Sequence, residues 1–387
     1  MSTVLAAANP ALRTEKPIRV MVVDDAVVVR SLLARWVDAE PDMQVIASLR
    51  TGREAVARIG ESKADVVVLD IDMPELDGIS ALPLLLQKRR DLVVIMVSTF
   101  TRRSAEISLR ALALGAADYI PKPETTREAT TSVSFRRELI EKIRTLGRNR
   151  YTARRPAPEI APMPHGKPVP GLRAQKSPPH AAEPLRLRPF AAVAPRVLLI
   201  GSSTGGPQAL TALIEKLPAA VDRAPVLIAQ HMPPMFTTVM AEHLSRVGGR
   251  GAHEADDGEP VLAGGIYIAP GGRHMRVVRA ADGIRIALGD DPPINFCKPA
   301  VDALFVSAVA VWGAATLALV LTGMGADGTR GAAAIAAAGG SVIVQDESTS
   351  VVWGMPRSVA QAGLCSAVLP LDQIAPKVIR LFSGVRA

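Results

Sequence analysis

The sequence predicts an α/β protein composed of two doubly wound domains. A chain of 387 residues is longer than the roughly 100–200 residues of an ordinary domain. Its hydrophobic content of 48% suffices for two packed cores. Apolar runs of strand length alternate with amphipathic helical stripes on both sides of a proline-rich stretch, which is typical of parallel sheets covered by helices. We therefore expect domains over residues 18–147 and 195–387, a tail over 1–17 and a linker over 148–194.

The basic charge of the chain is concentrated in the linker. The formal net charge is +8, and residues 148–190 contain seven Arg and two Lys against two Glu, with ten of the 31 prolines. Proline fixes φ and lacks a backbone donor, so this stretch predicts an extended, solvated spacer. The charge therefore does not indicate a folded nucleic-acid interface, and no helix-turn-helix pattern follows the first domain. We expect no nucleic-acid partner.

Neither a membrane span nor a disulfide framework is predicted. Residues 303–326 carry no charge, but three glycines interrupt this run, so it is interpreted as a buried helix followed by a buried strand. The first residues show no basic stretch followed by an apolar one, and we expect a cytoplasmic protein without a secretory signal or membrane insertion. Two cysteines, Cys297 and Cys365, are too few for a disulfide scaffold or a four-cysteine zinc site.

The first domain is predicted to contain strands that alternate with amphipathic helices. Apolar runs that end in polar residues mark four strands, over residues 18–25, 64–74, 92–98 and 117–123. Apolar side chains at helical spacing follow the first strand, at Val29, Leu32, Leu33, Trp36 and Val37. The last helical stripe comprises Phe135, Leu139, Ile140, Ile143 and Leu146. Gly147 is expected to cap this last helix.

Polar side chains stand at the ends of these four strands. They are Asp24, Asp25, Asp70, Ser98 and Lys122. Because the carboxyl ends of parallel strands meet at one edge, where ligands of such sheets bind, we expect these side chains to lie together. Three carboxylates repel one another and need a cation, and Mg²⁺ prefers oxygen ligands, while a hydroxyl and an ammonium would hold phosphoryl oxygens. The pattern predicts a carboxylate that accepts a phosphoryl group.

Each of these residues also has a simpler interpretation. Asp24 or Asp25 alone could cap the following helix, Ser98 could lie in a turn, and Lys122 could be a solvated charge. Asp72 could be an ordinary loop acid. These separate interpretations explain poorly why such residues end four strands.

The motifs VVDD, LDIDMPELDG, VS and YIPKP, in this order along residues 18–147, resemble the response-regulator receiver domain, whose parallel sheet is flavodoxin-like. The resemblance implies that a histidine kinase supplies a phosphoryl group and that Asp70 accepts it. It also implies that Mg²⁺ serves this reaction. The ligands would be Asp25, Asp70, the backbone carbonyl of Asp72 and, through water, Asp24.

The same resemblance implies a conformational switch in the first domain. Ser98, Tyr119 and Lys122 would respond to the phosphoryl group. The bond between Lys122 and Pro123 would be cis, as in that family. Phosphorylation would bias a two-state element and would not perform the output chemistry itself.

The second domain is predicted to hold a mainly parallel sheet with one added antiparallel hairpin. Strand-like apolar runs occupy residues 196–200, 225–230, 315–321 and 341–347. Pro207 suits the first turn of a helix whose apolar side chains are Leu210, Leu213, Ile214 and Leu217. The hairpin is expected over residues 265–278, with its turn at 270–272.

The turn after the strand at 196–200 fits the pattern G-x-S-x-G over residues 201–205. This pattern can present Ser203 as a nucleophile between a strand and a helix. Its glycines permit a tight backbone, and the helix N-terminus offers N–H groups to a developing oxyanion. The same string could cradle a phosphate, although no Walker lysine follows it.

A serine nucleophile needs a base, and the base needs an acid that orients it. His231 ends the next strand and Asp327 follows a later one, so a parallel sheet could bring both to Ser203. Taken alone, His231 could be a turn histidine and Asp327 a glycine-turn acid. The order Ser, His, Asp differs from that of α/β-hydrolases, so that fold is not expected. The other histidines, in the linker, a surface helix, a polar loop and the hairpin, are not expected in the site: His165, His180, His243, His253 and His274.

From residue 196 onward, GSSTGGP, QHMPP, YIAPGGRH, TGMGADG and VVWGMP resemble, in the same order, the catalytic domain of chemotaxis protein-glutamate methylesterases. A receiver followed by this domain is the domain order of that family. The resemblance implies Ser203 as the nucleophile, His231 as the general base and Asp327 as the orienting acid.

Other positions of this domain carry weaker expectations. Backbone N–H groups near Thr204 and Met324 are expected to form the oxyanion hole, and Ser202 is given no catalytic role. Cys297 and Lys298 stand where relatives usually carry a histidine and a basic residue. Cys297 is expected to be a buried or loop cysteine, and this departure to affect substrate contacts more than the three site residues.

The resemblance implies phosphorylation-activated hydrolysis of γ-glutamyl methyl esters on methyl-accepting chemoreceptors, through an acyl-enzyme. It also implies deamidation of selected glutamines by the same chemistry. The unphosphorylated receiver would inhibit the esterase, and ester hydrolysis would need no cofactor. Two other classes remain open at this point: a catalytically inert response-regulator binding module, and a transcriptional regulator whose basic linker contacts DNA.

Overall fold

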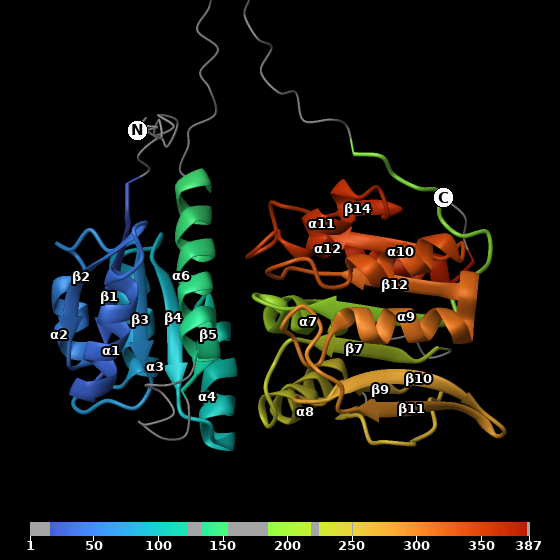
Figure 1. The fold of residues 1–387 in the computed structure, drawn as a ribbon, viewed down its shortest axis with the longest axis horizontal. Helices are drawn as coiled ribbons and strands as arrows, with labels where there is room; N and C mark the ends of the chain where they lie inside the picture. Colours follow the sequence, from blue (N-terminus) through green and yellow to red (C-terminus); the bar gives the residue numbers. More distant parts are fainter. Residues whose placement is uncertain (1–15, 123–132, 154–184, 218–223, 250, 385–387) are drawn as a thin grey trace, which may run out of the picture. The chain divides into compact units, whose positions relative to one another are not determined.

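The computed structural model describes five stretches of the chain (Figure 1), residues 16–122, 133–153, 185–217, 224–249 and 251–384. They form two compact units, each with its own parallel sheet. Within these stretches, every helix is too short or too polar for a transmembrane segment. The expected cis bond at Lys122–Pro123 and most of the expected tail and linker lie outside the described residues.

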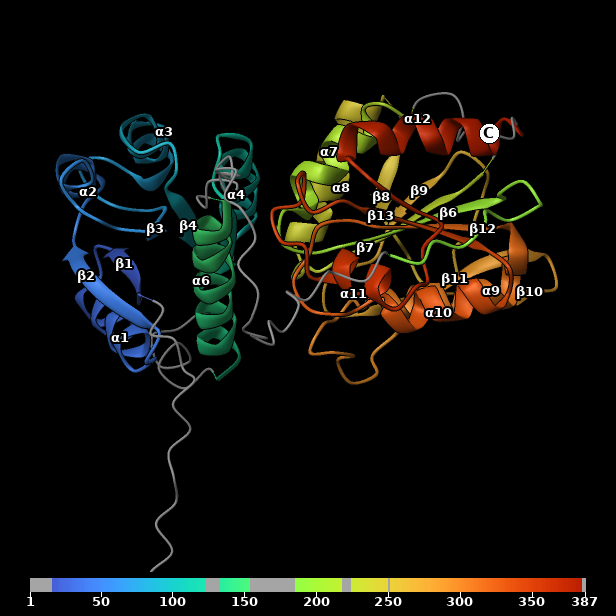
Figure 2. The ribbon, with the colours of Figure 1, turned by 90° about the horizontal axis from the view of Figure 1, so that it is seen from above.

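The first unit is a five-stranded parallel sheet in the order β2-β1-β3-β4-β5. Its strands are β1 (Ile18–Val23), β2 (Met43–Leu49), β3 (Val66–Asp70), β4 (Val93–Ser98) and β5 (Asp118–Pro121). Its helices are α1 (Val27–Asp38), α2 (Gly52–Arg58), α3 (Gly78–Lys88), α4 (Arg102–Ala113) and α6 (Val133–Ala153). Helices α1 and α6 share one face of the sheet, where Trp36 and Phe135 meet with ring centroids 5.9 Å apart, and α2 and α3 lie on the other (Figure 2). This strand order is flavodoxin-like, and the predicted fold is confirmed.

Two details of the first unit differ from the sequence-based expectation. Strand β2 was not predicted because, at the edge of the sheet, only Met43 and Leu49 at its two ends are buried. Helix α6 does not end at Gly147, so the predicted cap is wrong. A Cβ at this position would lie 2.8 Å from Cγ2 of Ile18. The glycine therefore lets the helix pass close to β1.

The second unit is a seven-stranded parallel sheet in the order β14-β13-β12-β6-β7-β9-β8, with a separate antiparallel hairpin. The sheet strands are β6 (Val197–Ser202), β7 (Val226–Gln230), β8 (Ala252–Glu254), β9 (Ile266–Ile268), β12 (Thr316–Val320), β13 (Ser341–Gln345) and β14 (Ala367–Leu369). Helices α7 (Gly206–Ile214), α8 (Phe236–Gly248) and α12 (Leu371–Phe382) cover one face (Figure 2). The other face carries α9 (Val301–Trp312), α10 (Thr329–Ala337) and α11 (Met355–Gln361), with a short 3₁₀ turn η1 (Gly313–Ala315) after α9.

The antiparallel hairpin exists, but one strand later than predicted. Strand β9 stays in the large sheet and pairs in parallel with β7 and β8. The hairpin is formed by β10 (His274–Ala280) and β11 (Gly283–Gly289). A Cβ on Gly271 would lie 2.1 Å from the backbone nitrogen of Pro234, so the Pro-Gly-Gly segment packs against the turn after β7. The chain therefore leaves the sheet at this segment and does not fold back on β9.

The central strands of this sheet form the core of the second unit. Strands β6, β7, β12 and β13 are buried along their whole length. The uncharged stretch 303–326 comprises most of α9, then η1, then β12, as predicted for a buried helix followed by a buried strand. Covered on both faces, such strands need apolar side chains throughout.

Candidate functional site

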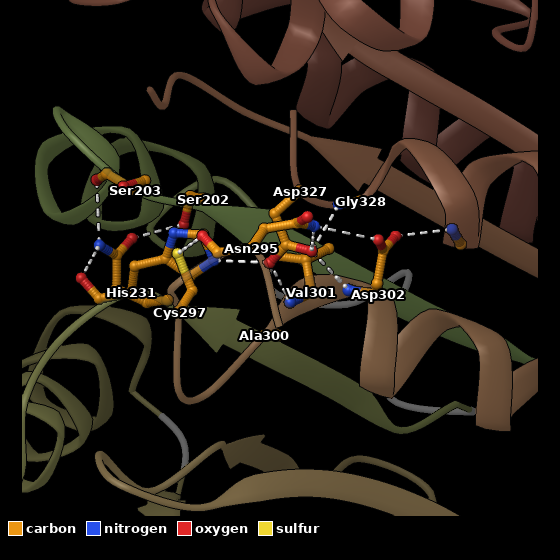
Figure 3. A network of polar contacts seen from close by, with 12 residues as sticks. Ser202, Ser203, His231, Asn295, Cys297, Ala300, Val301, Asp302, Asp327 and Gly328 are labelled. Carbon is orange, nitrogen blue, oxygen red and sulfur yellow. Dashed lines mark hydrogen bonds and ion pairs between the residues drawn. The ribbon is translucent and has the colours of Figure 1, made fainter. Parts of the chain in front are cut away.

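The carboxyl edge of the large sheet brings together the loops that carry Ser203, His231 and Asp327 (Figure 3). Strands β12, β6 and β7 are neighbours, and each of these residues follows one of them. Backbone hydrogen bonds join the loops, since the Ser203 N–H donates to Thr322 O (3.0 Å) and the His231 N–H donates to Ser202 O (3.0 Å). Residues far apart in sequence thereby come to one edge of the sheet, as expected.

The turn that carries Ser203 depends on glycine at two places. Gly205 has φ of 76°, in the left-handed region that glycine enters without strain. Gly323, in the loop after β12, passes so close that a Cβ there would lie 2.9 Å from Cβ of Ser203. The Ser203 side chain stays partly exposed between these segments. Its hydroxyl makes no hydrogen bond to any side chain in the described part of the chain.

His231 and Asp327 form a close side-chain pair at this edge. His231 Nε2 lies 2.8 Å from Asp327 Oδ2. Asp327 is 2% exposed, and its carboxylate accepts backbone N–H groups of Val301 (2.6 Å), Asp302 (3.1 Å) and Gly328 (2.9 Å). The first two belong to the first turn of α9, where the helix dipole favours negative charge.

The surroundings of Asp327 keep its carboxyl ionised. Burial raises its pKa, but the hydrogen bond and charge of His231 and the backbone donors lower it more, and the net shift is downward. An ionised acid at 2.8 Å can fix the orientation of the imidazole and stabilise its protonated form.

A buried amide joins the segments that carry Ser203 and His231. Gln230, the last residue of β7, is 2% exposed and pairs in register with Ser202 of β6. Its Nε2 donates to Ser203 O (3.0 Å) and His231 O (3.3 Å), and its Oε1 accepts from the Ser202 hydroxyl (2.6 Å). Ser202 thus has a structural role, as the partner of Gln230, that the sequence did not indicate. The sequence analysis also assigned no role to Gln230. Its position as the last strand residue before His231 could have indicated that it lies at the site.

Cys297 lies at this site, beside His231 and Asp327, a contact that the sequence did not predict. Its expected effect on substrate contacts stays a prediction. Its Sγ, a ring nitrogen of His231 and a carboxylate oxygen of Asp327 all lie within 4.8 Å of one another. Burial lowers the pKa of His231, but the charges and hydrogen bonds of Cys297 and Asp327 outweigh it and raise that pKa to about 10. Sequence spacing could not reveal this contact because Cys297 stands on a separate loop.

The other described histidines lie elsewhere. His274 is fully buried on β10, where Nδ1 accepts from the Ala300 N–H (3.2 Å) and Nε2 faces Pro292 O (3.1 Å). It therefore anchors both ends of the loop that carries Cys297. His243, on helix α8, contacts Thr211 of α7. His253 lies on strand β8, where a polar loop was expected, and contacts Glu259. His165 and His180 lie outside the described residues.

The backbone positions expected for the oxyanion hole remain predictions. Thr204 directly follows Ser203, and Met324 lies in the loop between β12 and Asp327. Both loops therefore reach the same edge of the sheet as the Ser203 side chain.

The carboxyl edge of the first sheet gathers the second group of predicted residues. Carboxylate oxygens of Asp24, Asp25 and Asp70 lie within 4.8 Å of one another. Lys122 Nζ lies 2.8 Å from both Asp24 Oδ2 and Asp70 Oδ1. Burial is the main cause that raises the pKa of Asp70 to about 6, Lys122 opposes it, and the charge of Asp24 adds to it. Burial also lowers the pKa of Lys122, but the two carboxylates raise it more.

Besides Lys122, the expected switch residues lie on β4 and β5, which follow β3 in the sheet. Ser98 is fully buried at the end of β4, and its backbone carbonyl accepts the Lys122 N–H (2.6 Å). Tyr119 is buried on β5, and Asp72 is exposed in the loop after β3. Lys142 of α6, which the sequence did not single out, binds Asp118 (3.0 Å) and the backbone carbonyl of Tyr119 (2.7 Å).

The acid cluster fits a divalent cation. Lys122 bridges two of the three carboxylates, and Arg30 donates to the backbone carbonyls of Asp24 and Asp25. Three acids against two bases still leave negative charge at the edge. Hard oxygen donors in a partly open site are the ligands that Mg²⁺ takes in proteins. The donor set therefore agrees with the metal that the receiver resemblance implies.

The fold and the two sheet edges define a class of protein, in which a receiver domain is joined to an α/β domain with a hydrolase-like Ser, His and Asp arrangement. Comparison with known proteins narrows this class. A family model described as response regulator receiver domain matches residues 20–134, and one described as CheB methylesterase matches residues 198–378.

Similar proteins cover the whole chain. The protein-glutamate methylesterase/protein-glutamine glutaminase of group 2 operon from Rhodopseudomonas palustris is 59% identical over 390 residues, covering 100% of both chains. The relative of the same name from Bradyrhizobium diazoefficiens is 60% identical, covering 97% of this chain and 96% of its own. The crystal structure of the Thermotoga maritima CheB methylesterase catalytic domain is 41% identical, covering 49% of this chain and 100% of that chain, with a TM-score of 0.47. The chain belongs to the protein-glutamate methylesterase/protein-glutamine glutaminase family. The predicted family and the prediction of an enzyme are confirmed.

Proposed function

We propose that this protein hydrolyses γ-glutamyl methyl esters on methyl-accepting chemoreceptors in the cytoplasm, and deamidates selected glutamines, under control of phosphorylation. The observation that carries the proposal is the His231–Asp327 pair at 2.8 Å, on the sheet edge where the Ser203 turn also lies. The family membership supports the reaction class.

In the proposed reaction, the Ser203 hydroxyl attacks the ester carbonyl while His231 accepts its proton. Asp327 holds the ring through Nε2 and stabilises the imidazolium. Backbone N–H groups near Thr204 and Met324 bind the oxyanion. His231 then donates the proton to the leaving methoxide, methanol departs, and an acyl-enzyme remains.

Water completes the cycle. His231 takes a proton from water, the resulting hydroxide attacks the acyl carbon, and Ser203 leaves with the proton that His231 returns. The product is a free glutamate. With a glutamine substrate the same steps apply, and ammonia leaves in place of methanol. No cofactor is needed for these steps, since the three side chains supply nucleophile, base and orienting charge.

The first domain, proposed over residues 18–147, acts as the regulatory receiver. Asp70 accepts a phosphoryl group from a histidine kinase, and Asp25, Asp70 and the carbonyl of Asp72 would hold Mg²⁺, with Asp24 acting through water. The metal would supply charge neutralisation at the phosphoryl oxygens. Lys122 already bridges two of these carboxylates and is placed to bind the phosphoryl group.

Phosphorylation is proposed to relieve inhibition of the esterase. The switch residues would be Ser98 on β4, Tyr119 on β5 and Lys122 directly after β5, on one side of the strand that carries Asp70. The catalytic domain is proposed over residues 195–387 and the linker over 148–194. Neither membrane insertion nor a nucleic-acid partner is part of this proposal.

Methanol release from methylated receptors tests the proposal directly. Full-length protein should release methanol, a small phosphodonor should raise the rate, and Ser203→Ala should abolish it. The same variant should still be phosphorylated, which shows that the first domain remains folded. Unchanged methanol release in Ser203→Ala would favour the inert binding module instead.

A further inference from the structure

We propose that His231, Cys297 and Asp327 form a binding site for Zn²⁺, and that bound zinc blocks the esterase. The three residues supply a ring nitrogen, a thiol sulfur and a carboxylate oxygen that lie within 4.8 Å of one another. They are the three types of side chain that zinc uses in proteins. The site is separate from the acid cluster of the first domain, which offers only oxygen.

The geometry is close to that of a tetrahedral site. Zinc–ligand bonds of about 2.0–2.3 Å place tetrahedral ligand atoms roughly 3.3–3.8 Å apart. Atoms within 4.8 Å of one another can reach this separation by small side-chain rotations. His231 Nε2 and Asp327 Oδ2, now 2.8 Å apart, would need to separate by roughly 0.5 Å as the ion replaces their shared proton.

The loop before helix α9 presents the thiol in a fixed orientation. Ile294 and Cys297 exchange two backbone hydrogen bonds, of 3.1 and 2.8 Å. The two residues between them, Asn295 and Phe296, have φ of 50° and 64°, as in a type I′ turn. A phenylalanine in this region is strained, and such strain persists only where the surrounding structure imposes it.

The same loop is anchored on both sides of the turn. His274 holds Pro292 and Ala300, and the Lys298 carbonyl accepts the Gly272 N–H (3.1 Å). Lys298 itself points to Asp290, with Nζ 2.9 Å from the backbone carbonyl. The Lys298 ammonium therefore binds Asp290 and does not contact the Cys297 thiol in the described structure. A ligand held on such a support loses little conformational freedom when a metal binds.

Charge at the site favours a cation. Asp327 and Asp302 are both buried, and in the described residues neither forms an ion pair with a lysine or arginine. Asn295 Nδ2 lies 3.4 Å from Asp327 Oδ1 and 3.5 Å from Asp302 Oδ2, as a weak neutral partner to both. The charged partner of Asp327 is His231, and Arg330 acts on Asp302 through its charge without forming an ion pair with it. Two acids beside one imidazole therefore favour a cation at Asp327. A thiolate and an imidazole select zinc over Mg²⁺, which prefers oxygen.

Zinc at this position would stop the proposed reaction. With zinc on Nε2, the ring proton stays on the other nitrogen, so His231 has no lone pair left to accept the Ser203 proton. On binding, the Cys297 thiol and any protonated imidazole release their protons to solvent, and no oxidant or reductant is involved. His231, Cys297 and Ser203 are all partly exposed, so an ion can enter from solvent and a chelator can remove it. The inhibitory consequence, but not the metal site itself, rests on the proposed role of His231.

Zinc binding can be measured without reference to activity. Metal-free, full-length protein is titrated with ZnCl₂ against a chromogenic chelator, with Mg²⁺ in excess to occupy the acid cluster of the first domain. We expect one tight equivalent in the wild type and in Ser203→Ala. Loss of an outer-shell partner alone lowers metal affinity about 10–100-fold, so Cys297→Ser, which removes a direct ligand, should lower it at least that much. Binding of Co²⁺ should give a thiolate-to-metal charge-transfer absorption that Cys297→Ser lacks.

The second thiol of the chain supplies a matched control. Cys365→Ala removes this thiol, which is buried in the core, and should keep the tight equivalent. Equal zinc affinity of the wild type and Cys297→Ser would overturn the proposal. Inhibition by zinc should be reversed by EDTA and should be much weaker in Cys297→Ser, each protein being compared with its own metal-free rate. Thiol-dependent zinc binding that leaves methanol release intact would support the site and count against His231 as the base.

Discussion

The two parallel sheets of this chain use the same edge in opposite electrostatic ways. In the first unit, three carboxylates lie close together, Lys122 bridges two of them, and the pKa of Asp70 is raised to about 6. In the second, the carboxylate of Asp327 accepts three backbone N–H groups and faces His231, and its pKa is lowered. Both acids are buried, and burial raises the pKa of each.

The difference lies in the groups that surround each acid. Crowded carboxylates with too little positive charge favour a cation and an electrophilic phosphoryl group. A carboxylate held by the N-terminus of α9 remains ionised without a metal and can orient a histidine. Similar topology can therefore serve the proposed phosphoacceptor at one edge and the proposed base-orienting acid at the other.

The largest expected effect comes from removing the charge of Asp327. Asp327→Asn should lower the turnover number for methanol release about 10³–10⁴-fold, because the amide cannot stabilise the imidazolium. Asp302→Asn is the matched control, since Asp302 bonds to Gly331 N (2.7 Å) and not to His231. It should cause a much smaller loss. Equal losses would mean that the turnover number depends on buried negative charge near α9 and not on the orientation of His231 by Asp327.

The corresponding change at the other edge should affect control and leave basal chemistry intact. Asp70→Asn should remove phosphorylation and the whole phosphodonor-dependent increase in methanol release. The unstimulated rate should stay near that of the wild type, because Asp70 belongs to the other sheet. Asp77→Asn, at the cap of α3, is a suitable control and should keep the increase. A phosphodonor that still activates Asp70→Asn would contradict receiver control through this residue.

The pH profile of the esterase should depend on Cys297. His231 must be neutral to act as a base, and its pKa is raised to about 10, with Cys297 the strongest of the raising influences. The rate should therefore rise with pH up to that range in the wild type. Cys297→Ser removes this influence, so the profile should move to lower pH. Measuring initial rates against pH with a chelator present checks this. An unmoved profile would show that the thiol does not influence the base.

The pKa of Asp70 can be measured directly in the metal-free protein. Carbon NMR of the labelled carboxyl should give a midpoint of about 6, above its ordinary value of 3.8. Below this midpoint the ionised fraction of Asp70, the proposed phosphoacceptor, falls about tenfold for each pH unit. Lys122→Met should raise the midpoint further, and Asp24→Asn should lower it, because the lysine opposes and the acid supports the shift. Midpoints that change in the reverse directions would refute this account.

The smallest expected effect concerns the Gln230 amide, which joins the segments that carry Ser203 and His231. Gln230→Leu leaves the Ser202 hydroxyl and two backbone carbonyls without this partner. Unsatisfied buried groups cost about 1–3 kcal/mol of folding stability. The melting temperature should fall, and methanol release should fall modestly as Ser203 and His231 lose their common support. Ser202→Ala, which removes only one of the contacts, should have the smaller effect on both measurements.

Much of the fold could be predicted because local patterns agree with it. Buried strands such as β6 and β12 form continuous apolar runs, and the G-x-S-x-G turn places Ser203 directly after one of them. The sequence-based predictions were wrong where the path of the chain depends on contacts between residues distant in sequence. Gly147 ends no helix because it packs against β1, and the turn at 270–272 is redirected by the prolines after β7. The edge strand β2 was missed because most of its residues are not fully buried.

The sequence by itself determined which residue types end which strands, and this was enough to bring Asp24, Asp25, Asp70 and Lys122 to one edge and Ser203, His231 and Asp327 to another. Parallel strands turn any polar residue at their carboxyl ends into a neighbour of the others. Only the tertiary structure decided what surrounds those residues: the α9 amides on Asp327, the Gln230 amide between two loops, and the Cys297 thiol beside His231. These partners come from distant segments, and the electrostatic state of a buried group depends on every charge and dipole around it, whatever its place in the sequence.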